Sequence, residues 1–166
     1  RVTEVGKGVT TFRIGDYVFG MKIGGANAEY VAVRETAAIA LKPAALGFEE
    51  VAVTPFGALS ALDFVRDFAK LKRGEKILIH GASGAVGVFA VQLAKRMGAT
   101  VTGVCSTANL ALVRSLGAQT VVDYTQEDFT LGGETYDVIF DAVGKGPACM
   151  TTPRSRPRPA RTRRTR

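Results

Sequence analysis

A cluster of glycines and small residues lies between an apolar run and a segment of helical periodicity. The stretch Ala82-Ser83-Gly84-Ala85-Val86-Gly87 matches the spacing G-x-G-x-x-G, with alanine at the first glycine position. The apolar run 76–79 before it is typical of a buried strand, and residues 85–97 after it are typical of a largely buried helix. In that setting Gly84 would let the backbone approach a pyrophosphate, and Gly87 would let the helix pack close to the strand. We therefore expect these six residues to bind a dinucleotide; the alternative is a tight turn without a ligand.

Strands and helices alternate after this turn. Apolar runs at 101–104, 120–122 and 136–141 predict three further strands, and the pattern at 108–116 predicts a second helix. Both helices are followed by a glycine, Gly98 or Gly117, in the position of a left-handed cap. The order strand, helix, strand, helix, strand predicts a doubly wound α/β fold whose parallel sheet has right-handed crossovers.

The first part of the chain has a different pattern. Residues 1–42 are typical of short strands and turns, with strands expected at 17–19 and 29–33. Residues 48–68 show helical periodicity. Within them, Pro55 and Gly57 predict a kink or a join between two helices.

Positive charge is concentrated near the C-terminal end. The formal net charge is +7, and residues 151–166 contain seven arginines and no acid. Subtracting these seven from the 22 Lys and Arg leaves 15, which balance the 15 Asp and Glu. Since 147–166 lacks apolar periodicity, we expect it to be disordered. Its arginines could bind polyphosphate non-specifically, but without aromatic residues to stack on bases they predict no specific nucleic-acid partner.

Several other classes are excluded by simple counts. The two cysteines, Cys105 and Cys149, are too few for a disulfide framework, and neither has a His or Cys neighbour at metal-ligand spacing. The longest uncharged run is interrupted by His80 and the glycines after it, and the first residues lack the apolar core of a signal peptide. We expect a cytoplasmic protein with no membrane partner and no bound zinc.

The segment after the second strand of the sheet bears on the coenzyme. NAD sites carry an acidic residue there, about 20 residues after the glycine turn, which binds the adenine ribose. This chain has Ser106 and Thr107 and no carboxylate, which favours NADP over NAD; both residues could instead cap the next helix. After the fourth strand, Val143 and Gly144 lie at the carboxyl edge where such sheets bind ligands, with an ordinary loop as the alternative.

With these motifs in place, the sequence resembles the medium-chain dehydrogenase/reductase superfamily. The resemblance is to its zinc-independent quinone oxidoreductase and enone reductase branch, often described as NAD(P)-dependent alcohol dehydrogenase-like. The matching stretches run in order over residues 1–145: 15–20, 28–31, 79–87, 116–118, 122–124 and 137–144.

The resemblance implies an organisation for the whole chain. Residues 1–45 would be the later half of a GroES-like catalytic domain, 46–73 connecting helices, and 74–146 the first part of a Rossmann cofactor domain, followed by the basic tail 147–166. The family's sheet order 3-2-1-4-5-6 would be present only as 3-2-1-4, so that the fourth strand forms an open edge. Relative to the family, the chain would be truncated at both ends.

The resemblance also implies an activity. Members of this branch transfer hydride from NADPH to a quinone, an enone or a related carbonyl substrate, and full-length relatives would be homodimers. Tyr124, in the family's Asp-Tyr pair, would line the adenosine phosphate pocket. Phe56 stands where zinc-dependent relatives place a zinc-binding cysteine, which argues against a metal. No catalytic residue is assigned, and two alternatives stay open: a dinucleotide-binding fragment without catalysis, and nucleic-acid binding through the arginine-rich tail.

Overall fold

The computed structural model describes residues 1–144 together with the backbone of 161–162. Its internal contacts divide the chain into two compact units, Arg1–Phe56 and Gly57–Arg166. The finer domain bounds expected at 45, 73 and 146 are not tested by this division and stay predictions. The expected disorder of the basic tail falls on residues outside the described part of the chain, apart from 161–162.

The first unit contains a short antiparallel strand pair. β1 (Val18–Gly20) pairs with β2 (Ile39–Leu41), with Phe19 opposite Ala40. The strand expected at 29–33 is wrong, because the structure has no strand there and Tyr30 is 74% exposed. Alternation of polar and apolar residues yields a strand only where a neighbour takes up its backbone hydrogen bonds, and the strand pairing of this unit involves only β1 and β2 in the described residues.

One long helical segment follows. α1 (Phe48–Leu62) continues through Pro55, and the π-helix η1 (Asp63–Phe68) extends it. The helical extent predicted for 48–68 is therefore confirmed, whereas the expected join between two helices at 55–57 is wrong. The change of helix type comes only after Leu62, where the hydrogen-bond pattern widens.

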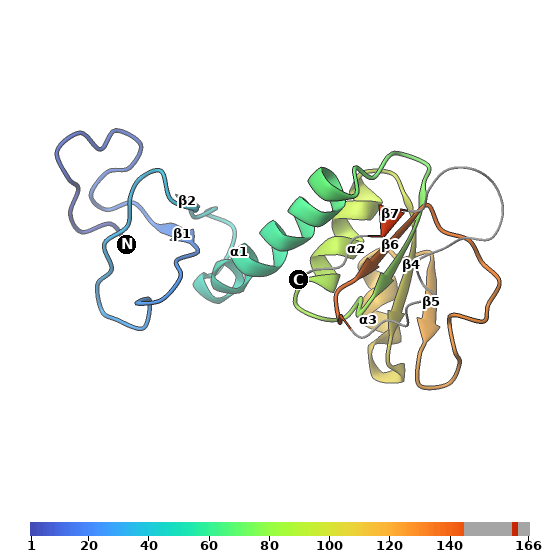
Figure 1. Ribbon diagram of the computed structural model, residues 1–166. Coiled ribbons are helices and arrows are strands. Elements are labelled where there is room, and N and C mark those ends of the chain that lie inside the picture. Colours follow the sequence, from blue (N-terminus) through green and yellow to red (C-terminus); the bar gives the residue numbers. More distant parts are fainter. Residues whose placement is uncertain (145–160, 163–166) are drawn as a thin grey trace. The chain divides into compact units, whose positions relative to one another are not determined.

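The second unit contains a sheet with the order β5-β4-β3-β6-β7, in which every neighbouring pair is parallel (Figure 1). Its four main strands are β3 (Lys76–His80), β4 (Thr100–Cys105), β5 (Thr120–Asp123) and β6 (Val138–Asp141). Three helical segments, α2 (Gly87–Arg96), η2 (Thr107–Asn109) and α3 (Leu110–Ser115), connect β3 to β4 and β4 to β5. Counted from the strand before the glycine turn, the order is 3-2-1-4, and the expected parallel sheet of an incomplete Rossmann-type α/β domain is confirmed.

The edge beyond β6 differs from the expectation. β7 (Arg161–Thr162) pairs in parallel with β6, placing Arg161 beside Val138. The expectations of an open edge at β6 and of disorder throughout 147–166 are therefore wrong over these two residues. An edge strand presents unpaired N–H and C=O groups, and any extended backbone can satisfy them whatever its side chains, so the composition of the tail did not exclude pairing.

The helices cover one face of this sheet. Ile77 and Ile79 of β3 are fully buried in a core shared with residues of α1, η1, α2 and α3 (Ala61, Val65, Ala90 and Val113). Because side chains alternate along a strand, Leu78 and His80 lie on the opposite face. There the segment after β5 reaches back across the sheet, and the ring centroids of Phe129 and His80 are 5.2 Å apart.

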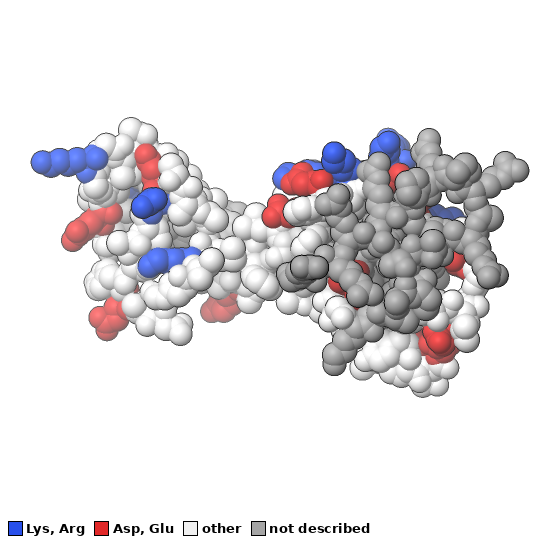
Figure 2. Space-filling view, viewed as in Figure 1, with Lys and Arg blue, Asp and Glu red and all other residues white. Residues whose placement is uncertain are grey.

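Charged residues of both signs are interspersed on the face of the described chain that Figure 2 shows. This agrees with the balance of acidic and basic residues outside the C-terminal segment. Among the described residues, no helix has both the length and the apolar character needed to cross a membrane.

Candidate functional site

The residues predicted to bind a cofactor lie in the segments that follow four parallel strands. The glycine turn follows β3, Ser106 and Thr107 follow β4, Tyr124 follows β5, and Val143 and Gly144 follow β6. Since the strands are parallel, all four segments leave the same edge of the sheet. The structure thus gathers the predicted residues along one edge, which is where open α/β sheets bind their ligands.

The glycine turn is held to the sheet by backbone hydrogen bonds. The N–H groups of Gly81 and Ala82 donate to the carbonyl of Val104 at 3.1 and 3.0 Å, and the N–H of Gly84 donates to the carbonyl of Gly81 at 3.0 Å. The side chain of Ala82 is fully buried in the core, so it contributes to a site only through its backbone. α2 then starts at Gly87 with no side-chain cap, and the N–H groups of Val88 and Ala90 already donate to the carbonyls of Gly84 and Val86, each at 3.0 Å. An anion would therefore be bound by the N–H groups that precede Val88.

The two motif glycines that remain in this turn have different surroundings. A Cβ on Gly87 would lie 2.0 Å from the carbonyl oxygen of Gly81 and 2.8 Å from the Cα of Ala82, so α2 packs directly on the backbone of the turn. A Cβ on Gly84 would meet only the Gly81 oxygen, at 3.3 Å, and Gly84 is exposed. Gly87 therefore allows close packing, whereas Gly84 leaves open space above the helix N-terminus.

The other residues of the glycine turn differ in their exposure to solvent. Ser83 and Val86 are half-buried, and Ala85 is exposed. The exposed positions 84 and 85 are thus the ones that a bound group could approach, while 82 and 87 face the protein.

A second cluster joins the ends of β4 and β5. The hydroxyl of Thr107 donates to the carboxylate of Asp123 at 2.5 Å, and both the N–H and the hydroxyl of Thr125 donate to the same carboxylate at 2.9 and 2.7 Å. The hydrogen bond from Thr107, followed by those from Thr125, lowers the pKa of the buried Asp123 below its ordinary value. Asp123 therefore stays ionised and fixes the residues next to Ser106 and Tyr124.

Sequence reasoning missed the part that Asp123 plays. No carboxylate lies close to Thr107 in the sequence, but Asp123 reaches Thr107 from the end of the neighbouring strand. The pairing of Cys105 with Asp123 in the parallel register brings the two strand ends together, and this register cannot be read from the motif spacing. The Asp-Tyr pair at 123–124 was the available signal.

Ser106 has the backbone position of a cap without acting as one through its side chain. It precedes η2 with an extended backbone, and its side chain makes no capping hydrogen bond. Its hydroxyl oxygen instead accepts from the side-chain amide of Asn109 at 3.1 Å.

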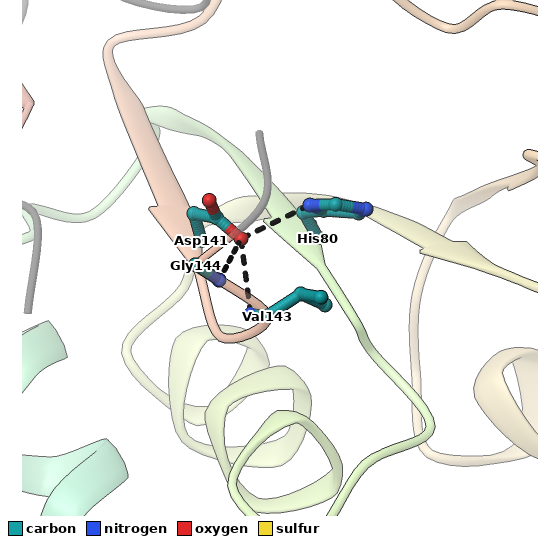
Figure 3. A network of polar contacts seen from close by, with 4 residues as sticks. All are labelled: His80, Asp141, Val143 and Gly144. Atoms are coloured by element: carbon teal, nitrogen blue, oxygen red, sulfur yellow. Dashed lines mark hydrogen bonds and ion pairs between the residues drawn. The ribbon is translucent and has the colours of Figure 1, made fainter. Parts of the chain in front are cut away.

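A third cluster links the ends of β3 and β6 (Figure 3). One carboxylate oxygen of Asp141, Oδ1, lies 3.0 Å from Nδ1 of His80 and accepts the N–H groups of Val143 and Gly144, each at 3.0 Å. The contact with Asp141 holds the imidazole of His80 at the end of β3. The turn containing Val143 and Gly144 is therefore fixed by a side chain of the strand before it.

An open groove adjoins these clusters. It has a volume of about 440 Å³ and is lined by His80 and by residues 124–129. Tyr124 is 54% exposed and forms part of its wall. The groove therefore extends the candidate site from the strand ends toward the segment after β5.

Possible metal ligands are not clustered in the described residues. No group of three or more His, Cys, Asp or Glu side chains there is arranged to hold a metal ion. Burial raises the pKa of the Cys105 thiol, which disfavours the thiolate that binds metals. Cys149 lies outside the described part of the chain.

Comparison with known proteins gives a consistent family. Residues 85–154 match the family model described as zinc-binding dehydrogenase. The 2-methylene-furan-3-one reductase of Solanum lycopersicum is 38% identical over 156 residues, which are 87% of this chain and 40% of that protein. The chloroplastic NADPH-dependent alkenal/one oxidoreductase of Arabidopsis thaliana is 38% identical over 154 residues, covering 86% of this chain and 39% of that protein.

Solved structures agree with this. The quinone oxidoreductase from Coxiella burnetii has a TM-score of 0.75 and 38% identity, over 85% of this chain and 45% of its own. An alcohol dehydrogenase superfamily protein from Novosphingobium aromaticivorans has a TM-score of 0.77 and 35% identity, over 84% of this chain and 45% of its own. The chain spans half or less of the length of these relatives, and over that length it is similar to quinone oxidoreductase-like members of the medium-chain dehydrogenase/reductase superfamily.

Proposed function

We propose that this chain binds NADPH along the carboxyl edge of its sheet, as the cofactor site of a zinc-independent oxidoreductase that reduces quinones or α,β-unsaturated carbonyl compounds. The observation that carries the proposal is the contrast between Gly87 and Gly84. A Cβ at Gly87 would collide with backbone atoms, whereas a Cβ at Gly84 would meet only the Gly81 oxygen, at 3.3 Å, near the N-terminus of α2, which has no side-chain cap. A turn that served packing alone would need only Gly87.

The residues at the strand ends fit a dinucleotide in an extended pose. The pyrophosphate would lie over Gly84 and Ala85 at the start of α2. Ser106, Thr107 and Tyr124 would contact the adenosine end, and Val143 and Gly144 would line the path toward the nicotinamide. Each of these positions follows a different strand, so a single ligand could bridge them.

The environment of Asp123 supports the phosphorylated coenzyme. In an NAD site a free carboxylate accepts hydrogen bonds from the adenine ribose. Both carboxylate oxygens of Asp123 already accept hydrogen bonds from Thr107 and Thr125. The side chain is therefore not presented to a ribose, and the relative from Arabidopsis thaliana whose name states NADPH dependence is consistent with this preference.

The chain's own contribution to the reaction is binding and orientation. When bound, NADPH supplies the hydride that is transferred to the substrate. The glycine turn and the segments after β4, β5 and β6 would fix the cofactor relative to the sheet and so set the direction of its reactive ring. With one His and two Cys in the sequence, we propose that no zinc takes part.

The domain organisation of the chain and its cellular location are part of the proposed function. We assign residues 1–45 to the catalytic domain, 46–73 to connecting helices and 74–146 to the cofactor domain. We place the protein in the cytoplasm, where its two cysteines would stay reduced.

Two assays on the purified chain test the proposal. NADPH fluorescence titration measures binding, and loss of absorbance at the NADPH band with a simple enone or a quinone measures turnover. We expect saturable binding, with oxidation above background where the chain suffices for catalysis. Binding without oxidation would favour the alternative of a non-catalytic cofactor-binding fragment, and the absence of binding would contradict the proposal.

Nucleic-acid binding is a second candidate because seven arginines occur in residues 151–166. Such a segment would bind DNA without sequence preference, and the affinity would fall steeply with salt. A chain lacking residues 151–166 is the direct comparison. Salt-sensitive DNA binding that persists in the shortened chain would rule out the tail as its cause.

A further inference from the structure

The cofactor edge has two turns that face each other, and a single carboxylate oxygen connects them. Asp141 Oδ1 accepts the N–H groups of Val143 and Gly144 and also contacts Nδ1 of His80, all at 3.0 Å (Figure 3). His80 is the last residue of β3 and immediately precedes the glycine turn. The oxygen therefore joins the end of one strand to the turn after its neighbour.

The sheet register holds this contact in place. His80 and Asp141 are direct partners in the parallel pairing of β3 with β6, so their side chains leave the same face of the sheet. Their side chains are 13% and 21% exposed, which limits competition from water. On its other side the His80 ring packs against Phe129, with 5.2 Å between ring centroids.

The turn after β6 also packs onto the glycine turn. Gly81 has a φ of +77°, and a Cβ there would lie 2.6 Å from Cγ2 of Val143. The side chain of Val143 therefore fills the space that Gly81 leaves open. Any movement of the turn at 142–144 changes the separation between the two segments that would contact the dinucleotide.

We propose that His80 and Asp141 are positioning residues for the dinucleotide. Together they hold the turn at 142–144 against Gly81 and so set the separation between this turn and the glycine turn, the two segments that would contact the dinucleotide. The inference rests on the proposed function, because it assigns the pair to the same site. Neither side chain needs to touch the cofactor. Asp141 holds two backbone N–H groups, and His80 fixes the carboxylate that holds them.

A purely structural role is the competing explanation, and it makes a different prediction. If the pair served only stability, its loss would lower the melting temperature in proportion to the lost hydrogen bond and would leave cofactor affinity unchanged. If the pair fixes the separation of the two turns, its loss lowers NADPH affinity by more than the loss of folding stability accounts for. A hydrogen bond to a charged group is strong enough for its loss to change affinity by about tenfold.

Three variants separate these explanations. His80→Leu removes the ring nitrogen, whereas His80→Asn keeps an N–H donor close to the position of Nδ1. The matched control is Gln119→Leu, which removes another part-buried hydrogen bond in the same sheet, from the N–H of Val101 to Oε1 of Gln119 at 2.7 Å. That bond lies beyond the N-terminal end of β5, at the edge opposite the cofactor segments.

NADPH fluorescence titration and thermal melts are measured for each variant. We expect about tenfold weaker NADPH binding in His80→Leu, binding within about twofold of wild type in His80→Asn, and unchanged binding with a lower melting temperature in Gln119→Leu. Wild-type affinity in a folded His80→Leu would overturn the inference. If the wild-type chain shows no NADPH fluorescence change at all, the proposed function itself fails and the inference falls with it.

The wild-type chain provides an independent readout that does not depend on any variant folding. His80 is the only histidine of the sequence, so its imidazole resonances are assigned without ambiguity. We expect these resonances to move during NADPH titration and to saturate with the dissociation constant found by fluorescence. Resonances that stay unchanged while NADPH fluorescence reports binding would contradict a role of the pair at the site.

Discussion

Substituting alanine for each motif glycine in turn separates packing from ligand binding. In Gly87→Ala the new Cβ would lie 2.0 Å from the carbonyl oxygen of Gly81 and 2.8 Å from the Cα of Ala82. Both obstacles are backbone atoms that cannot rotate away, so α2 must move by about 1 Å or more, and overpacking of this kind costs about 3 kcal/mol. For a protein of this size that corresponds to a fall in melting temperature of roughly 6–12 °C.

Gly84→Ala should behave differently. The only atom near its new Cβ is the Gly81 oxygen at 3.3 Å, so the unliganded fold should change by less than about 1 kcal/mol. The added methyl group would occupy the space through which a pyrophosphate approaches the helix N-terminus. We expect NADPH affinity to fall at least about tenfold, equivalent to ~1.4 kcal/mol.

Circular dichroism melts and NADPH fluorescence titrations on both variants check this pair of predictions. Gly87→Ala should lower the melting temperature of the free protein, and Gly84→Ala should lower affinity at a nearly unchanged melting temperature. A wild-type melting temperature in Gly87→Ala would refute the close packing of α2 on the turn. A wild-type affinity in Gly84→Ala would refute the location of the pyrophosphate.

Two further substitutions test the core and the cluster at the strand ends. Ile79→Ala removes a fully buried side chain of β3 and should destabilise the protein by about 2–5 kcal/mol, measured by urea unfolding; a loss below about 1 kcal/mol would contradict its place in the core. The pKa of Asp123 is lower in the folded state than in the unfolded state. Its ionised carboxylate therefore stabilises the fold at pH values above the ordinary aspartate pKa of about 4. This contribution is lost as the pH falls through the lower pKa of the folded state. The difference in melting temperature between wild type and Asp123→Asn should therefore shrink between pH 7 and pH 3, and a constant difference would show that the carboxylate charge is not what stabilises the cluster.

The parallel sheet could be predicted from the sequence because its signals are local. The apolar runs that became β3 and β4, and the glycines after the helices, mark element ends without any knowledge of the partner strands. The segment 29–33 failed because a strand also needs a neighbour, and sequence alternation does not supply one. β7 was not predicted because its pairing with β6 uses backbone groups, which the composition of the segment does not reveal.

The candidate site was predictable only in its backbone parts. The glycine turn follows from motif spacing, because the same few residues make both the turn and the helix start. The clusters centred on Asp123 and Asp141 depend on which strands lie side by side and in what register. Asp123 meets Thr107, and Asp141 meets His80, across 16 and 61 residues of sequence, and no local pattern connects either pair.

The central claim is that the carboxyl edge of this sheet binds NADPH, and thermal melting of the wild-type chain with and without coenzyme tests it most directly. A ligand that binds only the folded state at a hundredfold excess over its dissociation constant stabilises it by about 2.7 kcal/mol, or roughly 5–11 °C in melting temperature. We expect NADPH to raise the melting temperature by this amount and NADH, at the same concentration, to raise it less. A melting temperature that neither coenzyme changes would contradict the assignment of this edge as a dinucleotide site.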